Sequence, residues 1–133
     1  SKAYGELMGG LYRDKHGVES VFLRIGSCFP EPTDARMLAT WLSYADLTRL
    51  IACATLAPSL GPAGSVVIWA ASNNSRMTWW RRDGRAVIGW TPQDSADSYV
   101  AALEGKTSGD PVVERYQGGG FAGIDYSRAA PPR

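Results

Sequence analysis

The sequence predicts an α/β fold in which helices cover a doubly wound parallel sheet on both faces. Apolar residues spaced three and four apart predict a helix over residues 2–16. Two mostly apolar runs, at 18–25 and 66–71, predict strands that are buried on both faces. The segment between these runs has the pattern of a helix. A strand, helix and strand in this order predict a right-handed parallel crossover.

The ends of the two longer helices carry clear signals. The first helix is followed by Gly17, a residue suited to the left-handed position after a helix. The second begins after Ser43, which is a good N-cap, and Asp46 occupies its third helical position. Pro58 marks its end.

The carboxyl-terminal part of the chain is less regular. A short helix is predicted that is capped near Asp94 or Ser95 and runs to about Leu103. From residue 105 onward glycine, proline and charged residues dominate, which predicts an extension that lies on the surface or is partly irregular. We therefore divide the chain into part of an α/β domain (1–104) and a carboxyl-terminal extension (105–133). Two parallel strands leave an open edge, which predicts further strands in an amino-terminal half.

Composition excludes several function classes. Fourteen basic and thirteen acidic residues lack the basic excess of a nucleic-acid-binding protein, and we interpret Arg81-Arg82 as a solvated loop face. No apolar run approaches the ~20 residues of a membrane span, and no signal peptide is evident. Two cysteines and one histidine form neither a disulfide framework nor a metal-ligand cluster. We expect a soluble, cytoplasmic protein without a metal.

The most informative segment follows the first strand. The apolar run breaks at Gly26 into a loop stiffened by prolines, which presents Ser27, Cys28 and Arg36. In an open α/β sheet, ligands bind beyond the carboxyl ends of the strands. The planar fork of an arginine can hold a carboxylate there. This loop therefore predicts a small acidic substrate.

Each of these residues also has a purely structural interpretation. Arg36 could pair with Asp34 or Glu31, and Ser27 could simply cap the end of the strand. No activating partner is evident for Cys28, so we do not expect it to be a nucleophile.

Several motifs, taken together and in order, resemble one enzyme family over nearly the whole chain. They resemble the carboxyl-terminal half of the extended short-chain dehydrogenases/reductases (the NAD-dependent epimerase/dehydratase family), and more narrowly the uronate dehydrogenases. The motifs are Arg24-Ile25-Gly26-Ser27-Cys28 with Pro30-Glu31-Pro32, Arg36-Met37-Leu38, Thr40-Trp41-Leu42-Ser43, Trp79-Trp80, Gly89-Trp90-Thr91-Pro92 and Gln117-Gly118-Gly119.

The resemblance implies a Rossmann-type sheet with a small substrate-binding region, and it assigns residue roles. Lys2 would be the catalytic lysine of a Tyr-x-x-x-Lys pair and would also contact the nicotinamide ribose. Ile25 and Cys28 would place the nicotinamide amide through their backbone groups, and Ser27 and Arg36 would bind the substrate. The tyrosine would stand three residues before Ser1, so we expect the isolated chain to be inactive.

The activity that the resemblance implies is oxidation of a hexuronate, glucuronate or galacturonate, at its anomeric carbon. NAD would be the cofactor, an aldarolactone the product, and the complete protein a homo-oligomer. One alternative is a nucleotide-sugar epimerase or dehydratase of the same superfamily. A non-catalytic binding module is the other, and measured NAD affinity would separate it from an enzyme.

Overall fold

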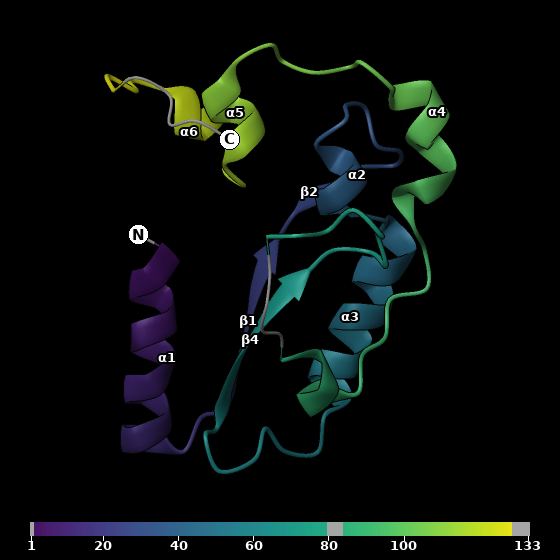
Figure 1. Ribbon diagram of the computed structural model, residues 1–133. Coiled ribbons are helices and arrows are strands. Elements are labelled where there is room, and N and C mark those ends of the chain that lie inside the picture. Colours follow the sequence, from purple (N-terminus) through teal and green to yellow (C-terminus); the bar gives the residue numbers. More distant parts are fainter. Residues whose placement is uncertain (1, 80–83, 129–133) are drawn as a thin grey trace.

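The computed structural model describes residues 2–79 and 84–128 (Figure 1). Ser1, Trp80, Arg81 and Arg82 of the sequence interpretation lie outside the described residues. The elements, in chain order, are α1 (Lys2–His16), β1 (Ser20–Ile25), β2 (Ser27–Cys28), α2 (Met37–Thr40), β3 (Trp41–Leu42), α3 (Tyr44–Leu56), β4 (Ser65–Ala70), the 3₁₀ helices η1 (Arg85–Ile88) and η2 (Ala96–Tyr99), α4 (Val100–Leu103), α5 (Pro111–Arg115) and α6 (Gly120–Gly123).

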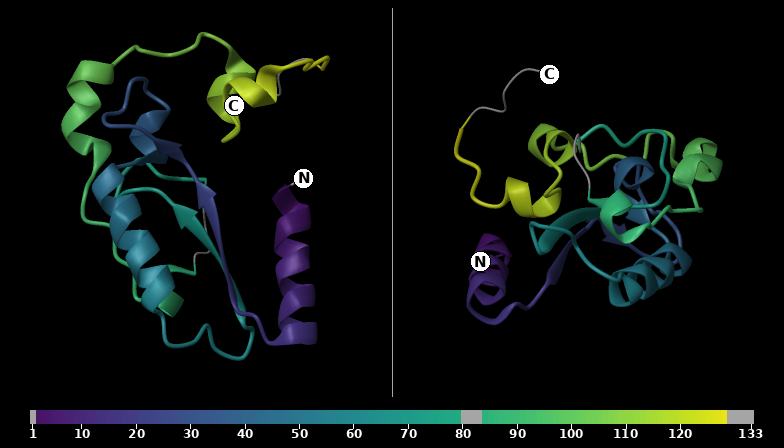
Figure 2. Two further views of the ribbon diagram at one scale, coloured as in Figure 1. Left: turned by 180° about the vertical axis from the view of Figure 1, so that it is seen from behind. Right: turned by 90° about the horizontal axis from the view of Figure 1, so that it is seen from below.

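The centre of the molecule is the parallel pair β1 and β4. Their register runs from Ser20 opposite Ser65 to Ile25 opposite Ala70. Helix α1 lies on one side of this pair and α3 on the other, and the front and back views agree on this (Figures 1 and 2). The predicted α/β class with parallel strands and a helix on each side is therefore confirmed.

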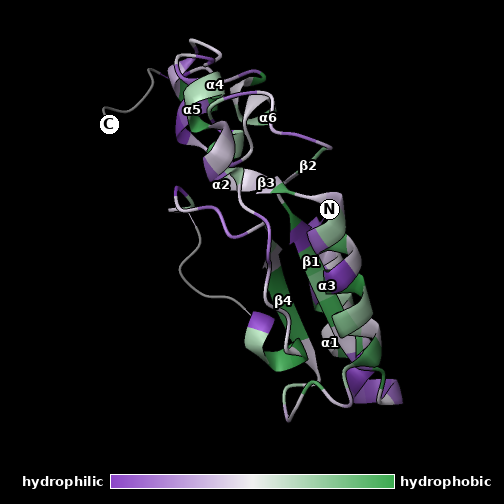
Figure 3. Ribbon diagram, turned by 90° about the vertical axis from the view of Figure 1, so that its right-hand side faces the viewer, coloured by the Kyte–Doolittle hydropathy of each residue, from purple (hydrophilic) through white to green (hydrophobic). Residues whose placement is uncertain are grey.

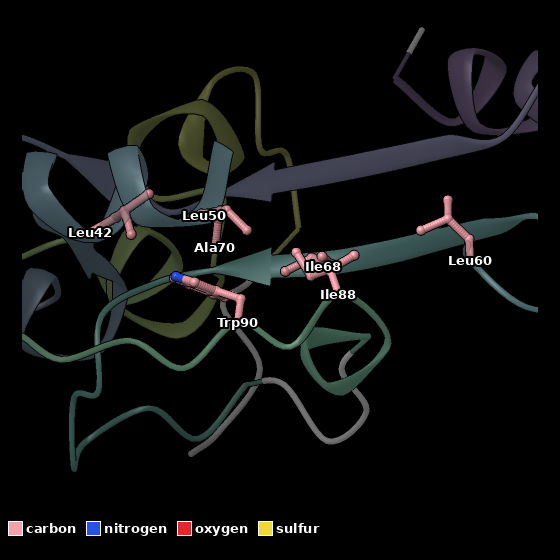
Figure 4. Close-up of a cluster of buried hydrophobic side chains, with 7 residues drawn as sticks. All are labelled: Leu42, Leu50, Leu60, Ile68, Ala70, Ile88 and Trp90. Atoms are coloured by element: carbon pink, nitrogen blue, oxygen red, sulfur yellow. The ribbon is translucent and has the colours of Figure 1, made fainter. Parts of the chain in front are cut away.

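The main hydrophobic core lies between this strand pair and α3. Figure 4 shows its buried members, which come from β3, α3, β4 and the segments around them. The two strands are largely hydrophobic along their length (Figure 3), as strands covered on both faces should be. The members are Leu42, Leu50, Leu60, Ile68, Ala70, Ile88 and Trp90.

The start of α3 is fixed by a buried polar network. Ser43 caps the helix as predicted, and its Oγ accepts a hydrogen bond from the backbone N of Asp46 at 2.9 Å. The Asp46 carboxylate is fully buried and accepts from Ser72 Oγ at 2.7 Å and from the backbone N atoms of residues 93 and 94 at 2.8 and 3.0 Å. Arg49 donates to it at 2.6 Å. This one side chain therefore ties α3 to the end of β4 and to the segment after Trp90.

The loop after β1 is more regular than the sequence suggested. Ser27 and Cys28 form β2, which pairs in parallel with Trp41 and Leu42 of β3, and Arg36 occupies the N-cap position of α2. The loop predicted after Gly26 is thus shortened to residues 29–36, with a short strand before it and the start of a helix after it. Backbone pairing with a segment 14 residues later along the chain supplies this order, and local sequence does not reveal it.

The carboxyl-terminal region forms the predicted short helix and then two more. Ser95 caps η2, and α4 ends at Leu103. Beyond residue 105, α5 begins after Asp110, whose carboxylate caps it, and α6 follows. Helices α5 and α6 lie at the carboxyl end of β1, near the start of α1 (Figure 1). The boundary proposed near residue 104 stays a prediction.

In the described part of the chain, the helices are all too short or too polar to cross a membrane.

Candidate functional site

A cavity of about 500 Å³ opens at the carboxyl end of β1. Three of the residues singled out from the sequence, Ile25, Ser27 and Arg36, line it together. They come from the end of β1, from β2 and from the start of α2. Its other lining residues are Gly26, Thr40, Gln117, Gly118, Gly119, Gly120 and Phe121. The cavity lies where ligands bind in open α/β sheets.

Gly26 allows two backbone segments that border this cavity to pack against each other. A Cβ on this residue would lie 2.1 Å from the carbonyl oxygen of Thr40 at the end of α2. Its backbone N donates to the carbonyl of Ala70, at the end of β4, at 3.0 Å. The end of α2 therefore packs directly on the turn between β1 and β2, an approach that only glycine permits.

Ser27 faces a second hydroxyl that the sequence analysis did not single out. Its Oγ lies 2.9 Å from Thr40 Oγ1, and both residues line the cavity. Thr40 Oγ1 also lies 3.4 Å from the carbonyl oxygen of Arg36. Ser27 thus belongs to a side-chain pair and is more than a cap on the strand. Thr40 sits 13 residues further along the chain, so only tertiary structure makes it a neighbour.

Arg36 is held by residues 115–121 (the carboxyl-terminal segment). Its Nη2 donates to the carbonyls of Tyr116 at 3.1 Å and Gln117 at 2.8 Å, and its guanidinium carbon lies 5.8 Å from the Trp79 ring centroid. Within residues 2–79 and 84–128, no carboxylate forms an ion pair with it. Asp34, one of the partners considered for it, instead accepts from the backbone N of Met37 at 2.9 Å.

Lys2 lines a different but adjoining cavity. This space of about 540 Å³ lies between the start of α1 and β1, and Ile25 lines both cavities. Lys2 and Arg36 therefore lie at the same end of the sheet without sharing one cavity. Glu6, one helical turn beyond Lys2, is held in a two-pronged ion pair by Arg24, at 2.7 and 2.8 Å.

The Arg24 pair determines the charge state of Glu6. Hydrogen bonds from this guanidinium hold the pKa of the Glu6 carboxyl below its usual value. Arg24 engages both carboxylate oxygens of Glu6. No ion pair to Lys2 occurs among the residues that the structure describes.

Cys28 lies outside the lining of both cavities. It is half-buried in β2 and packs against the main core. Burial raises the pKa of its thiol, which disfavours the thiolate that a nucleophilic cysteine needs. No group of histidine, cysteine and acidic side chains in the described residues has the arrangement of a metal site.

The carboxyl-terminal segment adds residues to the site that the local sequence pattern does not predict. Residues 117–121 form one wall of the cavity, although they lie about 80 residues after Arg36. The Gln117-Gly118-Gly119 motif had contributed to the family resemblance, and this was the only signal for them. Trp79, another part of that resemblance, contacts both this segment and Arg36.

Comparison with known proteins identifies relatives of this chain, although no family model matches it. It is 42% identical over 125 residues to a uronate dehydrogenase of Pseudomonas putida, covering 92% of this chain and 45% of that protein. The crystal structure of a glucuronic acid dehydrogenase from Chromohalobacter salexigens matches with a TM-score of 0.79 at 41% identity, covering 97% of this chain and 47% of that one.

A further match is to a variant of the Agrobacterium tumefaciens uronate dehydrogenase, solved in complex with NAD. It has a TM-score of 0.79 at 36% identity and covers 98% of this chain and 48% of that chain. The resemblance predicted from the motifs is thus confirmed. In sequence and in fold, the chain corresponds to a portion of the uronate dehydrogenases and spans a little under half of their length.

Proposed function

We propose that the protein containing this chain is an NAD-dependent oxidoreductase that oxidises a hexuronate at its anomeric carbon to an aldarolactone. One observation carries the proposal. Arg36 lines a cavity at the carboxyl end of β1, beside the Ser27 and Thr40 hydroxyls, and no carboxylate of the described residues pairs with it. A fixed cation beside sugar-compatible hydroxyls is what recognition of a small sugar acid requires. The similarity to a glucuronic acid dehydrogenase supports the same substrate class.

In this proposal, Arg36 binds the carboxylate of the substrate. Its Nη2 already donates to two backbone carbonyls, so that nitrogen is committed to holding the side chain in place. Nη1 makes no hydrogen bond within the described residues, and it supplies the first contact to the acid. Ser27 and Thr40 offer hydroxyls that both donate and accept, which suits the hydroxyl groups of a sugar.

A nicotinamide cofactor fits the residues at this end of the sheet. Val21, Leu23 and Ile25 give the cavity beside Lys2 an apolar side, and Lys2 adds an ammonium. Lys2 would hold a ribose hydroxyl, and the backbone of Ile25, which lines both cavities, would orient the amide. NAD, when bound, supplies the hydride acceptor. The Lys2 charge would also lower the pKa of the tyrosine of the Tyr-x-x-x-Lys pair. The tyrosine must be ionised before it can accept a proton from the substrate.

We also propose that the complete protein is a cytoplasmic homo-oligomer. Tyr4, Leu7 and Leu11 lie on one face of α1 and are 66%, 75% and 46% exposed. Such a contiguous apolar face is typical of a surface that another polypeptide covers. Both cysteines are free, which fits a reducing compartment.

The experiment that tests the function is steady-state kinetics of the complete protein with Arg36→Lys. A lysine retains the charge and loses the planar fork, so we expect KM for glucuronate and galacturonate to rise by about tenfold or more, with a smaller change in kcat. Arg76→Lys, at an exposed position outside the cavity, should leave both constants unchanged.

An unchanged KM in the Arg36→Lys protein would show that Arg36 does not bind the substrate. The unsubstituted protein should also be assayed with nucleotide-sugars. Turnover of these compounds without turnover of free uronates would favour an epimerase or dehydratase. Failure to bind NAD would favour a non-catalytic module.

A further inference from the structure

Three successive backbone carbonyls of the carboxyl-terminal segment hold Arg36 and the neighbouring Trp79. The carbonyl of Arg115 accepts from Trp79 Nε1 at 3.2 Å, and those of Tyr116 and Gln117 accept from Arg36 Nη2 at 3.1 and 2.8 Å. Trp79 and Arg36 are themselves in contact, with the guanidinium carbon 5.8 Å from the ring centroid. The segment therefore binds both Trp79 and Arg36, and its carbonyls fix the position of the Arg36 guanidinium.

Gly119 is the point at which this segment comes closest to the guanidinium. A Cβ on Gly119 would lie 2.5 Å from Arg36 Nη1, 2.9 Å from its Cζ and 3.1 Å from its Nη2. The backbone of Gly119 has φ 57° and ψ −132°, a combination that residues with a side chain rarely adopt. The backbone conformation therefore requires glycine here, and a Cβ would in addition force the Arg36 guanidinium to shift.

We propose that Gly119 is a positioning residue for Arg36, and this inference rests on the proposed function. Because Gly119 lacks a side chain, the segment can approach the guanidinium closely enough for its carbonyls to accept hydrogen bonds from Nη2. Those contacts orient the guanidinium and leave Nη1 available for the substrate carboxylate. Any side chain at this position forces either the carbonyls to withdraw or Arg36 to turn, and in both cases the substrate meets a cation that is no longer held in place.

The test uses the complete protein and compares Gly119→Ala with Gly109→Ala. Gly109 has a similar positive φ, 74°, but a Cβ there would meet nothing within 4 Å, so this variant measures backbone strain without contact to Arg36. We expect Gly119→Ala to raise KM for the uronate about tenfold with kcat changed less than about threefold, as lost orientation of a binding group should do. Its preference for the uronate over the neutral uronamide should fall in parallel. Gly109→Ala should match the unsubstituted protein.

A double-substitution cycle with Arg36→Ala separates positioning from general damage. If Gly119 acts through Arg36, adding Gly119→Ala to Arg36→Ala should raise KM no further. A KM for Gly119→Ala equal to that of the unsubstituted protein, or equal added losses in both backgrounds, would overturn the inference. Lack of uronate turnover by the unsubstituted protein would instead reject the proposed function.

Discussion

At the scale of single residues, Asp46 shows how a buried charge can determine local architecture. Its side chain is 0% exposed, yet four groups donate to it, from α3, the end of β4 and the segment after Trp90. Burial alone would raise the pKa of this carboxyl, but the hydrogen bonds from Ser72, the backbone N of Gln93, Arg49 and the backbone N of Asp94 together hold it below its ordinary value. The folded state therefore favours the ionised form.

We predict that Asp46 makes the free energy of unfolding depend on pH in the acidic range. A carboxyl whose pKa is lower in the folded than in the unfolded chain stabilises the fold above its ordinary pKa. That contribution is lost as pH falls through the folded value, which lies below the ordinary 3.8. Asp46→Asn should cost about 3 kcal/mol at neutral pH, because donors of the network lose a charged acceptor. Denaturant unfolding at several pH values measures this.

The control for this prediction is Asp97→Asn. The pKa of Asp97 is also lowered: burial would raise it, but hydrogen bonds from Ser75 outweigh that effect. Asp97 lies at the surface, however, and its replacement should change unfolding little. If the free-energy difference between the unsubstituted protein and Asp46→Asn stays constant from pH 7 to pH 3, the ionised carboxylate is not what stabilises the network.

At the scale of elements, the site depends on how closely α2 approaches the end of β1. The carbonyl of Thr40 occupies the space that a side chain on Gly26 would need, and it is backbone, so it cannot rotate away. Asn74 fixes the same junction from the other side, since its amide nitrogen donates to the carbonyls of Ala39 at 3.2 Å and Trp41 at 2.8 Å. Two residues from different segments thus place α2, and with it Arg36.

We predict that Gly26→Ala both destabilises the protein and weakens substrate binding. The added methyl group must push α2 away from β1, and such overpacking costs about 1–3 kcal/mol. Gly61→Ala is a suitable comparison, because Gly61 has φ 73° but open space around it, and it should cost only about 1 kcal/mol of backbone strain. Thermal unfolding compares the two. Equal losses of stability would show that α2 can move without cost.

At the scale of the whole molecule, the described residues leave two surfaces uncovered. One is the edge of β1 that faces away from β4, which pairs with no other strand among the described residues. The other is the apolar face of α1 that includes Leu7. The chain spans a little under half the length of its relatives, and an uncovered strand edge is what a portion of a larger parallel sheet should present.

We predict that the face of α1 contacts a second copy of the complete protein. Leu7→Glu places a charge in that contact and should lower the oligomer mass in sedimentation without loss of secondary structure. Leu56→Glu is the matched control, since Leu56 is 79% exposed on α3, and it should leave the mass unchanged. An intact oligomer with lowered stability would show that this face packs within its own subunit.

Much of this protein could be predicted from local sequence, because the controlling interactions are local. The spacing of Tyr4, Leu7 and Leu11 gave α1, and Ser43 gave the start of α3, since caps and helical periodicity act within a few residues. The apolar runs gave both strands of the sheet and their parallel direction. The placement of Ile25, Ser27 and Arg36 at one end of the sheet followed from the topology of α/β folds.

Tertiary structure alone decided how Arg36 is held and what completes the cavity around it. Its partners at Tyr116 and Gln117 are backbone carbonyls about 80 residues away, and a backbone carbonyl is present at every position, so sequence carries no sign of which one will be used. The need for glycine at 26 and 119 likewise arises from atoms that meet only after folding. Sequence encodes which groups are available, whereas close packing of distant segments determines which of them meet.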